Sequence, residues 1–229
     1  MCSDKIEFID QRFITLALDI AYLLNESDKS KSEILKCTFV RSAISNLVPL
    51  VECVSNSCLF SLKLPTKLIE ELDKLPPLAK LDYFLFIHTK NHIDRSRHQT
   101  ELLVGVLKLR DQIVHPKPNS GKLSLKSINE QIDYGVSKAL KIPLDTREWT
   151  LVTAVLIKNI VFKFLINFFK VSCSFDIGRV TTILGMREKK LFHEQKYGTY
   201  FTVPKEEYVV IMKNLPELLD CFDVRLSTN

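Results

Sequence analysis

The sequence predicts a mainly α-helical protein with a small, partly β C-terminal extension. Apolar residues recur at helical spacing through most of the first three quarters of the chain, and proline or polar clusters separate these segments. Short β-favouring runs occur only near the C-terminus. The 229 residues, 46% of them hydrophobic, are enough to bury a sizeable core. We therefore expect a helical domain over residues 1–172 and an extension over residues 173–229.

Each element follows from a local pattern. Apolar spacing predicts helices over residues 6–24, 33–58, 78–92, 98–114, 128–140 and 147–171. Pro49 is expected to kink the second helix, and Pro116 to stop the fourth, because a residue before proline is pushed out of helical geometry. Three prolines between residues 59 and 77 indicate a connection with one short helix. In the extension, the runs VTTIL, TYFTV and YVVIM favour strands, and LPELLDCF favours a helix.

The chain is expected to be cytoplasmic. Its first residues, MCSDKIEFIDQRF, contain no apolar signal core, and none of the six cysteines forms a Cys-x-x-Cys pair. The apolar stretch 151–171 has the length of a membrane span, but it carries Lys158, Lys163 and Lys170, which are costly at bilayer depth. We interpret it as a buried helix and expect no membrane partner. Because it is apolar on more than one face, it is either central in the bundle or half-covered by a second copy.

Positive charge is concentrated in one part of the chain. The net charge is +5, too mild to indicate a strongly basic nucleic-acid-binding protein from composition alone. Residues 80–122 hold eight basic and four acidic side chains and so contribute most of this excess. Four of the five histidines lie there too. A site for an anionic partner is therefore expected within this segment.

The stretch LLVGVLKLRDQIVHPKP, residues 102–118, carries the candidate catalytic group. Four residues separate Arg110 from His115, and His115 stands directly before Pro116, which frees it from helical geometry. Histidine can move a proton to or from a ribose 2′-hydroxyl, and the forked guanidinium can neutralise charge on phosphorus. Asp111 could hold one imidazole nitrogen and fix the tautomer. No metal is needed if the 2′-hydroxyl is the nucleophile.

A helical chain with RDQIVH at the end of an apolar helix resembles the HEPN family, whose signature is Arg, four to six residues, then His. The resemblance implies a HEPN-like helical bundle that forms homodimers. It also implies a metal-independent endoribonuclease without cofactor, of the kind found in toxin–antitoxin or other defence systems, with an inhibitory partner protein. The roles carry over only at Arg110, Asp111 and His115. Some members have no known catalysis, so a non-catalytic nucleic-acid-binding or dimerisation module is the alternative.

Other residues of the basic segment are candidates for contacts with RNA. They are Lys90, Arg95, Arg97, Lys108 and Lys117, which could follow a phosphate backbone. An ordinary solvated face would explain such charges equally well. A third and weaker hypothesis is a helical effector or regulator whose tail engages another protein.

Competing interpretations of the motif remain open. Arg110 and His115 could simply lie at a helix C-terminus, where cations meet the helix dipole favourably. A second Arg–His match, Arg187 to His193, lies in the strand-like tail and is interpreted as coincidence. His88 and His92 stand four apart, but no glutamate lies between them as in zinc peptidases, so we expect no metal site.

Overall fold

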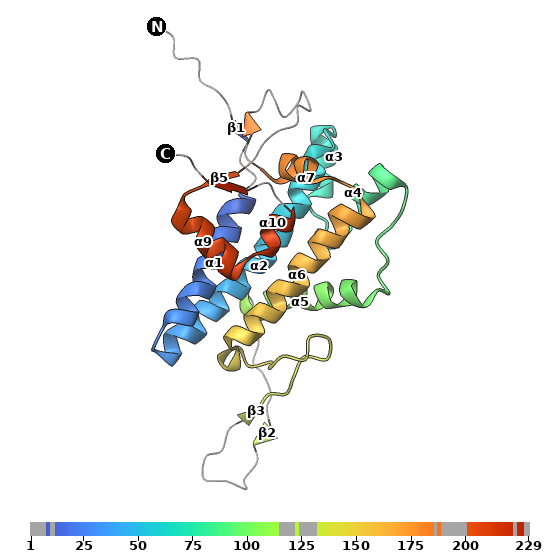
Figure 1. Ribbon diagram of the computed structural model, residues 1–229. Coiled ribbons are helices and arrows are strands. Elements are labelled where there is room, and N and C mark those ends of the chain that lie inside the picture. The colour runs from blue at the N-terminus through green and yellow to red at the C-terminus, as the bar shows by residue number, and fades with distance from the viewer. Residues whose placement is uncertain are drawn as a thin grey trace.

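The protein is a bundle of helices around one long central helix, as the computed structural model in Figure 1 shows. The structure describes the backbone of residues 8–9, 12–114, 122–123, 132–185, 187–188, 201–221 and 224–226, and the side chains of residues 12–109, 134–185 and 203–220. The expected mainly α-helical fold is confirmed.

The α-helices are α1 (Phe13–Lys29), α2 (Glu33–Ser61), α3 (Thr66–Leu72), α4 (Pro77–Thr89), α5 (His98–Val114), α6 (Leu151–Ile166), α7 (Ile177–Leu184), α9 (Lys205–Asn214) and α10 (Glu217–Cys221). A 3-10 turn, η1 (Thr146–Glu148), precedes α6, and a π-helical turn, η2 (Asn167–Ser172), follows it. Three two-stranded pairs join β1 (Phe8–Ile9) to β4 (Arg187–Glu188), β2 (Lys122–Leu123) to β3 (Ile132–Asp133), and β5 (Phe201–Val203) to β6 (Val224–Leu226).

Helix α2 is the central element and packs against α1, α4, α5, α6 and α7. It begins after Ser32, whose side chain accepts a hydrogen bond from the Leu35 N–H. Pro49 lies within it, but the helix continues unbroken to Ser61. The proline itself is exposed to solvent. The described helix thus has the predicted start and extends three residues beyond the predicted end.

Helix α1 differs from its predicted bounds at both ends. Residues 8–9 form β1 and pair with β4, which removes them from the helix. Arg12, at the helix N-cap, has a left-handed backbone (φ 54°) that is incompatible with a continuous helix from residue 6. At the other end the helix extends to Lys29, because Ser27 is buried and its hydroxyl donates to the Lys36 carbonyl of α2. Tertiary contact therefore extends the helix through a polar stretch.

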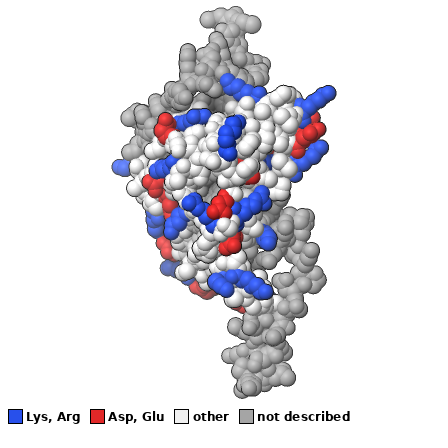
Figure 2. Space-filling model, turned by 90° about the vertical axis from the view of Figure 1, so that its right-hand side faces the viewer, with Lys and Arg blue, Asp and Glu red and all other residues white. Residues whose placement is uncertain are grey.

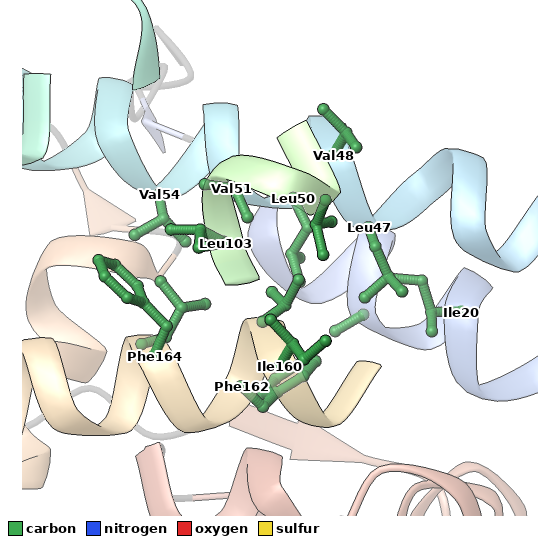
Figure 3. Close-up of a cluster of buried hydrophobic side chains, with 14 of the residues drawn as sticks. Ile20, Leu47, Val48, Leu50, Val51, Val54, Leu103, Ile160, Phe162 and Phe164 are labelled. Atoms are coloured by element: carbon green, nitrogen blue, oxygen red, sulfur yellow. The ribbon is translucent and has the colours of Figure 1, made fainter. Parts of the chain in front are cut away.

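The core is formed where α1, α2, α5 and α6 meet (Figure 3). In that view Leu103 of α5 lies between the valines of α2 and Phe164 of α6. The buried side chains labelled there are Ile20, Leu47, Val48, Leu50, Val51, Val54, Leu103, Ile160, Phe162 and Phe164. Burial of each such side chain contributes roughly 1.5–3 kcal/mol relative to exposure, so this contact supplies much of the driving force for folding.

Two helical stretches, α2 and Leu151–Ser172, are long and apolar enough to cross a membrane by length and composition. Within the structure α2 and α6 pack against one another, and 56% of the apolar window of the second stretch is buried. Core helices of a folded protein commonly meet the same criterion, so these lengths are weak indicators of a membrane protein. Val152, Val155 and Leu156 near the start of α6 remain exposed.

The sequence predicts a short helix over residues 128–140, and this prediction is wrong for residues 132–140, the part of the segment that the structure describes. Residues 132–133 form β3, and Val136 bridges Pro143 in a tight reversal of the chain. Gly135 has a φ of 79°, which a helix does not allow. The fully buried Trp149 fixes this segment, because its indole N–H donates to the Pro143 carbonyl at 2.8 Å. The segment then packs on α5 at Gly105, where a Cβ would lie 3.1 Å from Leu140.

Two of the three β-favouring runs in the C-terminal extension are helical. VTTIL lies in α7 and YVVIM in α9, whereas TYFTV contains β5. The β-branched residues of these two runs do not form strands, because Val180, Ile183 and Ile211 are instead buried on one face of their helices. Helix α9 packs against α1, and α10 against α6 and α7. The described part of residues 173–229 thus shares the core of the bundle.

A buried ion pair joins α6 to α10. The Lys158 ammonium, on a residue only 5% exposed, donates to both carboxylate oxygens of Glu217, at 2.8 and 2.9 Å. Glu217→Ala should lower the free energy of unfolding by about 3 kcal/mol, because it leaves this ammonium buried without its carboxylate. Urea unfolding followed by circular dichroism measures the change.

The matched control is the exposed pair between Lys213 of α9 and Asp28 of α1, which also links a C-terminal helix to the bundle. Lys213→Ala should cost much less stability than Glu217→Ala, since both partners are solvated. Equal losses in the two variants would contradict a stabilising role for the buried pair.

Candidate functional site

The candidate catalytic motif lies at the C-terminal end of α5. Leu103, Val106 and Leu109 are buried and hold this helix against α2 and α6. The backbone of Arg110 and Asp111 belongs to the last two turns of α5. Their side chains, and all of His115 and Lys117, lie outside the described residues. The structure therefore places the start of the motif at the C-terminal end of α5.

The connection between α4 and α5, residues 90–97, contains Lys90, Arg95 and Arg97 and is called the basic loop below. Asp82 of α4 accepts the Ile93 N–H at 2.6 Å, and Asp94 accepts both the N–H and the hydroxyl of Ser96. These hydrogen bonds from Ser96 hold the pKa of Asp94 below its ordinary value. Two carboxylates thus fix the path of the loop and the positions of its cations.

Four of the five predicted RNA-binding residues are described, and all four are exposed. Lys90 ends α4 in a left-handed conformation, with its ammonium 5.3 Å from the centre of the Phe86 ring. Arg97 lies close enough to Asp94 for electrostatic attraction. By contrast, the side chains of Arg95 and Lys108 form no hydrogen bond or ion pair with any other described residue.

Arg95 and Lys108 line one cavity of about 310 Å³ between α2, the start of α4 and α5, called the α5 cavity below. Its lining residues are Val48, Glu52, Pro76, Pro77, Leu78, Ala79, Arg95, Val104, Leu107 and Lys108. Most are apolar, as in ligand-binding sites, and two of the three charged ones are cations. On α5, the lining residues Leu107 and Lys108 lie about one turn before position 111.

A second cavity, of about 220 Å³, lies on the other side of the basic loop. His92, Asp94 and Arg97 line one wall, and Asn167 of η2 lines the opposite wall. Asn167 is already engaged, since its amide donates to Gln99 at 2.7 Å. Because Asp94 offsets the charge of Arg97, this cavity is a weaker anion site than the α5 cavity.

The two histidines at helical spacing have different partners. His92 Nδ1 lies 3.2 Å from Asp82 Oδ2, and its ring stacks on Phe86. His88 contacts the rings of Phe84 and Phe175, and its Nδ1 lies 3.5 Å from an Arg179 nitrogen. Within the part of the chain that the structure describes, no group of three His, Cys, Asp or Glu side chains is placed to hold a metal ion.

The buried cysteines are poorly suited to nucleophilic chemistry. Burial raises the pKa of Cys173 to about 12, despite the opposing effect of the Arg179 charge. Burial also raises the pKa of Cys58 well above its ordinary value. Both thiols therefore remain protonated at neutral pH and act as small apolar side chains.

Sequence reasoning missed the apolar wall of the α5 cavity. Pro76, Pro77 and Ala79 come from the start of α4, and Val48 comes from the middle of α2. No local pattern marks these residues, because they meet α5 only through the packing of the bundle. The sequence offered one signal, the Pro76-Pro77 pair at the start of α4, because two prolines restrict the backbone there.

On the face that carries the basic loop, the charged side chains form small separate groups. Figure 2 shows Lys and Arg side chains separated by uncharged surface and by Asp and Glu, without a continuous basic stripe among the described residues of this face. A long stripe is typical of proteins that follow a duplex backbone. The described residues of this face lack such a stripe.

Comparison of the chain with protein-family models, with curated proteins and with solved structures finds no match in any of the three.

The His88 contact has a measurable consequence. Burial, and secondarily the Arg179 charge, lower the pKa of His88 below its ordinary value of about 6.5. Folding therefore favours the neutral ring, and this stabilisation is lost as the pH falls from 6.5 through the lower folded pKa. In an NMR titration the His88 midpoint should lie below 6.5, and Arg179→Ala should raise it. An unchanged midpoint in that variant would show that the guanidinium does not act on the ring.

Proposed function

We propose that the protein is an RNA-binding protein of HEPN type with metal-independent endoribonuclease activity. One observation carries this proposal: two cations without described partners, Arg95 and Lys108, lie on a cavity alongside α5, the helix whose final turns hold Arg110 and Asp111. Because neither side chain is paired with a described carboxylate, both can bind a phosphate group. The helical bundle and the end of α5 just before His115 agree with the resemblance in the sequence.

The chemistry follows from the motif. His115 accepts the proton of the 2′-hydroxyl or returns one to the leaving 5′-oxygen, and Asp111 orients its ring. Arg110 stabilises the charge that develops on the phosphoryl oxygens through its fork of donors. The 2′-oxygen forms a bond to phosphorus as the bond to the 5′-oxygen breaks. The products are a 2′,3′-cyclic phosphate and a 5′-hydroxyl, and no cofactor takes part.

The proposal includes a setting for this activity. The resemblance favours a cytoplasmic toxin or defence protein that is held inactive by a partner protein. In this proposal the HEPN-like domain comprises residues 1–172, the part that the resemblance covers, and residues 173–229 form a small, partly β extension that packs on it through α7, α9 and α10.

A non-catalytic RNA-binding module is the second candidate. The same cations would serve it, and the start of the motif at the end of α5 is where cations stabilise a helix without any catalysis. Cleavage assays separate the two functions, because only the nuclease depends on the proton-transfer role of His115.

We expect purified protein to cleave a labelled mixed-sequence RNA with full activity in EDTA. His115→Ala should reduce the rate on the order of a hundredfold or more, because it removes the proton-transfer group. Arg110→Ala should cost a comparable factor, and Arg110→Lys should restore little because the fork is lost. Asp111→Asn should have a milder effect.

The matched control is His193→Ala, which removes the histidine of the second Arg–His match and should leave the rate unchanged. DNA of the same sequence should stay intact, since it lacks the nucleophile. Cleavage by His115→Ala at the wild-type rate would exclude the mechanism. RNA binding without cleavage by the wild-type protein would favour the module instead.

The proposed activity rests on a homodimer that brings two motifs together. Most of the apolar surface of α6 is buried within one chain, while Val152 and Leu156 remain exposed. Light scattering at micromolar concentration should give twice the chain mass of 26.4 kDa. A mass of one chain would contradict the dimer.

A further inference from the structure

We propose that the α5 cavity is a nucleotide subsite that takes one base of the RNA together with its phosphate, next to the bond that is cut. The inference rests on the proposed function and adds a binding site for the substrate to it. It depends on three features of the described residues, namely an apolar floor, two cations without partners and a position beside the motif.

The apolar part of the cavity lining suits an apolar surface such as the face of a nucleobase. It combines residues of α2, the start of α4 and α5, among them Val48, Ala79 and Val104. The rigid prolines at the start of α4 form part of the same wall. The volume of about 310 Å³ lies at the lower end of the range for small-molecule pockets. A single nucleobase therefore fits this cavity better than a large cofactor does.

The rim of the cavity suits a phosphate. Arg95 comes from the basic loop and Lys108 from α5, so two elements separated in the sequence supply cations to one opening. Both side chains are exposed and without described partners, unlike Arg97 beside Asp94. Among the described lining residues, the two cations outnumber the one carboxylate, Glu52.

The position of the cavity links it to cleavage. Leu107 and Lys108 line it, and Arg110 and Asp111 follow directly along the same helix. A nucleotide held here would place its neighbouring phosphate along α5 toward the motif. Single-stranded RNA offers an unstacked base for such a pocket, whereas a duplex does not. The subsite thus commits the protein to single-stranded RNA.

The test measures binding to the full chain in the His115→Ala background, which prevents cleavage. Fluorescence anisotropy compares a short mixed-sequence RNA with a ribose-phosphate oligomer of equal length that lacks bases. Ala79→Phe fills the cavity and should weaken binding of the RNA about tenfold, while the base-free oligomer binds as before. Ala79→Leu fills less space and should give an intermediate loss. Thermal unfolding confirms that both variants remain folded.

Removing the charge of Arg95 or Lys108 tests whether the cavity binds a phosphate. Arg95→Ala and Lys108→Ala should weaken both oligomers, and each should reduce the slope of log affinity against log salt by about 0.7, the value for one contact with a single strand. Two matched controls on α1, which contributes no residue to the cavity lining, should bind like the parent. They are Lys29→Ala for charge and Thr15→Phe for size.

The outcomes separate this inference from the proposed function. If Ala79→Phe and Ala79→Leu bind RNA like Thr15→Phe, or Arg95→Ala behaves like Lys29→Ala, the subsite is wrong even if cleavage depends on His115. If the wild-type protein does not cleave but Ala79→Phe selectively loses the base-containing oligomer, the subsite stands and the nuclease fails. Failure of the parent protein to bind either oligomer overturns both.

Discussion

Burial of α2 positions the helices around it, because α1, α4, α5, α6 and α7 all pack against this one helix. A helix of 29 residues with apolar side chains on several faces is stable only when neighbours cover those faces. Helices α1 and α4 cover part of it, and α5, α6 and α7 cover the rest. Because protein interiors are close-packed, these contacts fix each neighbour in position and in rotation about its own axis.

The rotation of α5 determines the candidate site. Burial of Leu103, Val106 and Leu109 turns one face of this helix toward α2 and α6. The adjoining face, with Leu107 and Lys108, then lines the α5 cavity. The same packing sets the direction in which the helix delivers the chain to His115. The position of a motif at the end of α5 therefore depends on the packing of Leu103, Val106 and Leu109, which have no chemical role themselves.

Buried and exposed cations of this protein differ in how their charge is balanced. Lys158 and Lys80 are buried, and each is paired with a carboxylate on another segment, Glu217 and Asp73 respectively. Such pairs satisfy charges that would be very costly alone in the interior, and they join distant parts of the chain. Arg95 belongs to the other group, since it is exposed and unneutralised among the described residues. Arg95 and Lys108 thus leave positive charge available to a ligand at the surface beside α5.

The sequence alone predicts the helical class and most helix positions, including both ends of α5, because apolar spacing and proline stops are local signals. It also identifies residues 80–122 as the basic segment. Tertiary packing, by contrast, makes VTTIL helical and residues 132–140 non-helical. The same packing brings Arg95 and Lys108 to one cavity. These outcomes depend on contacts between residues far apart in the chain, and no local pattern encodes which distant surfaces will meet.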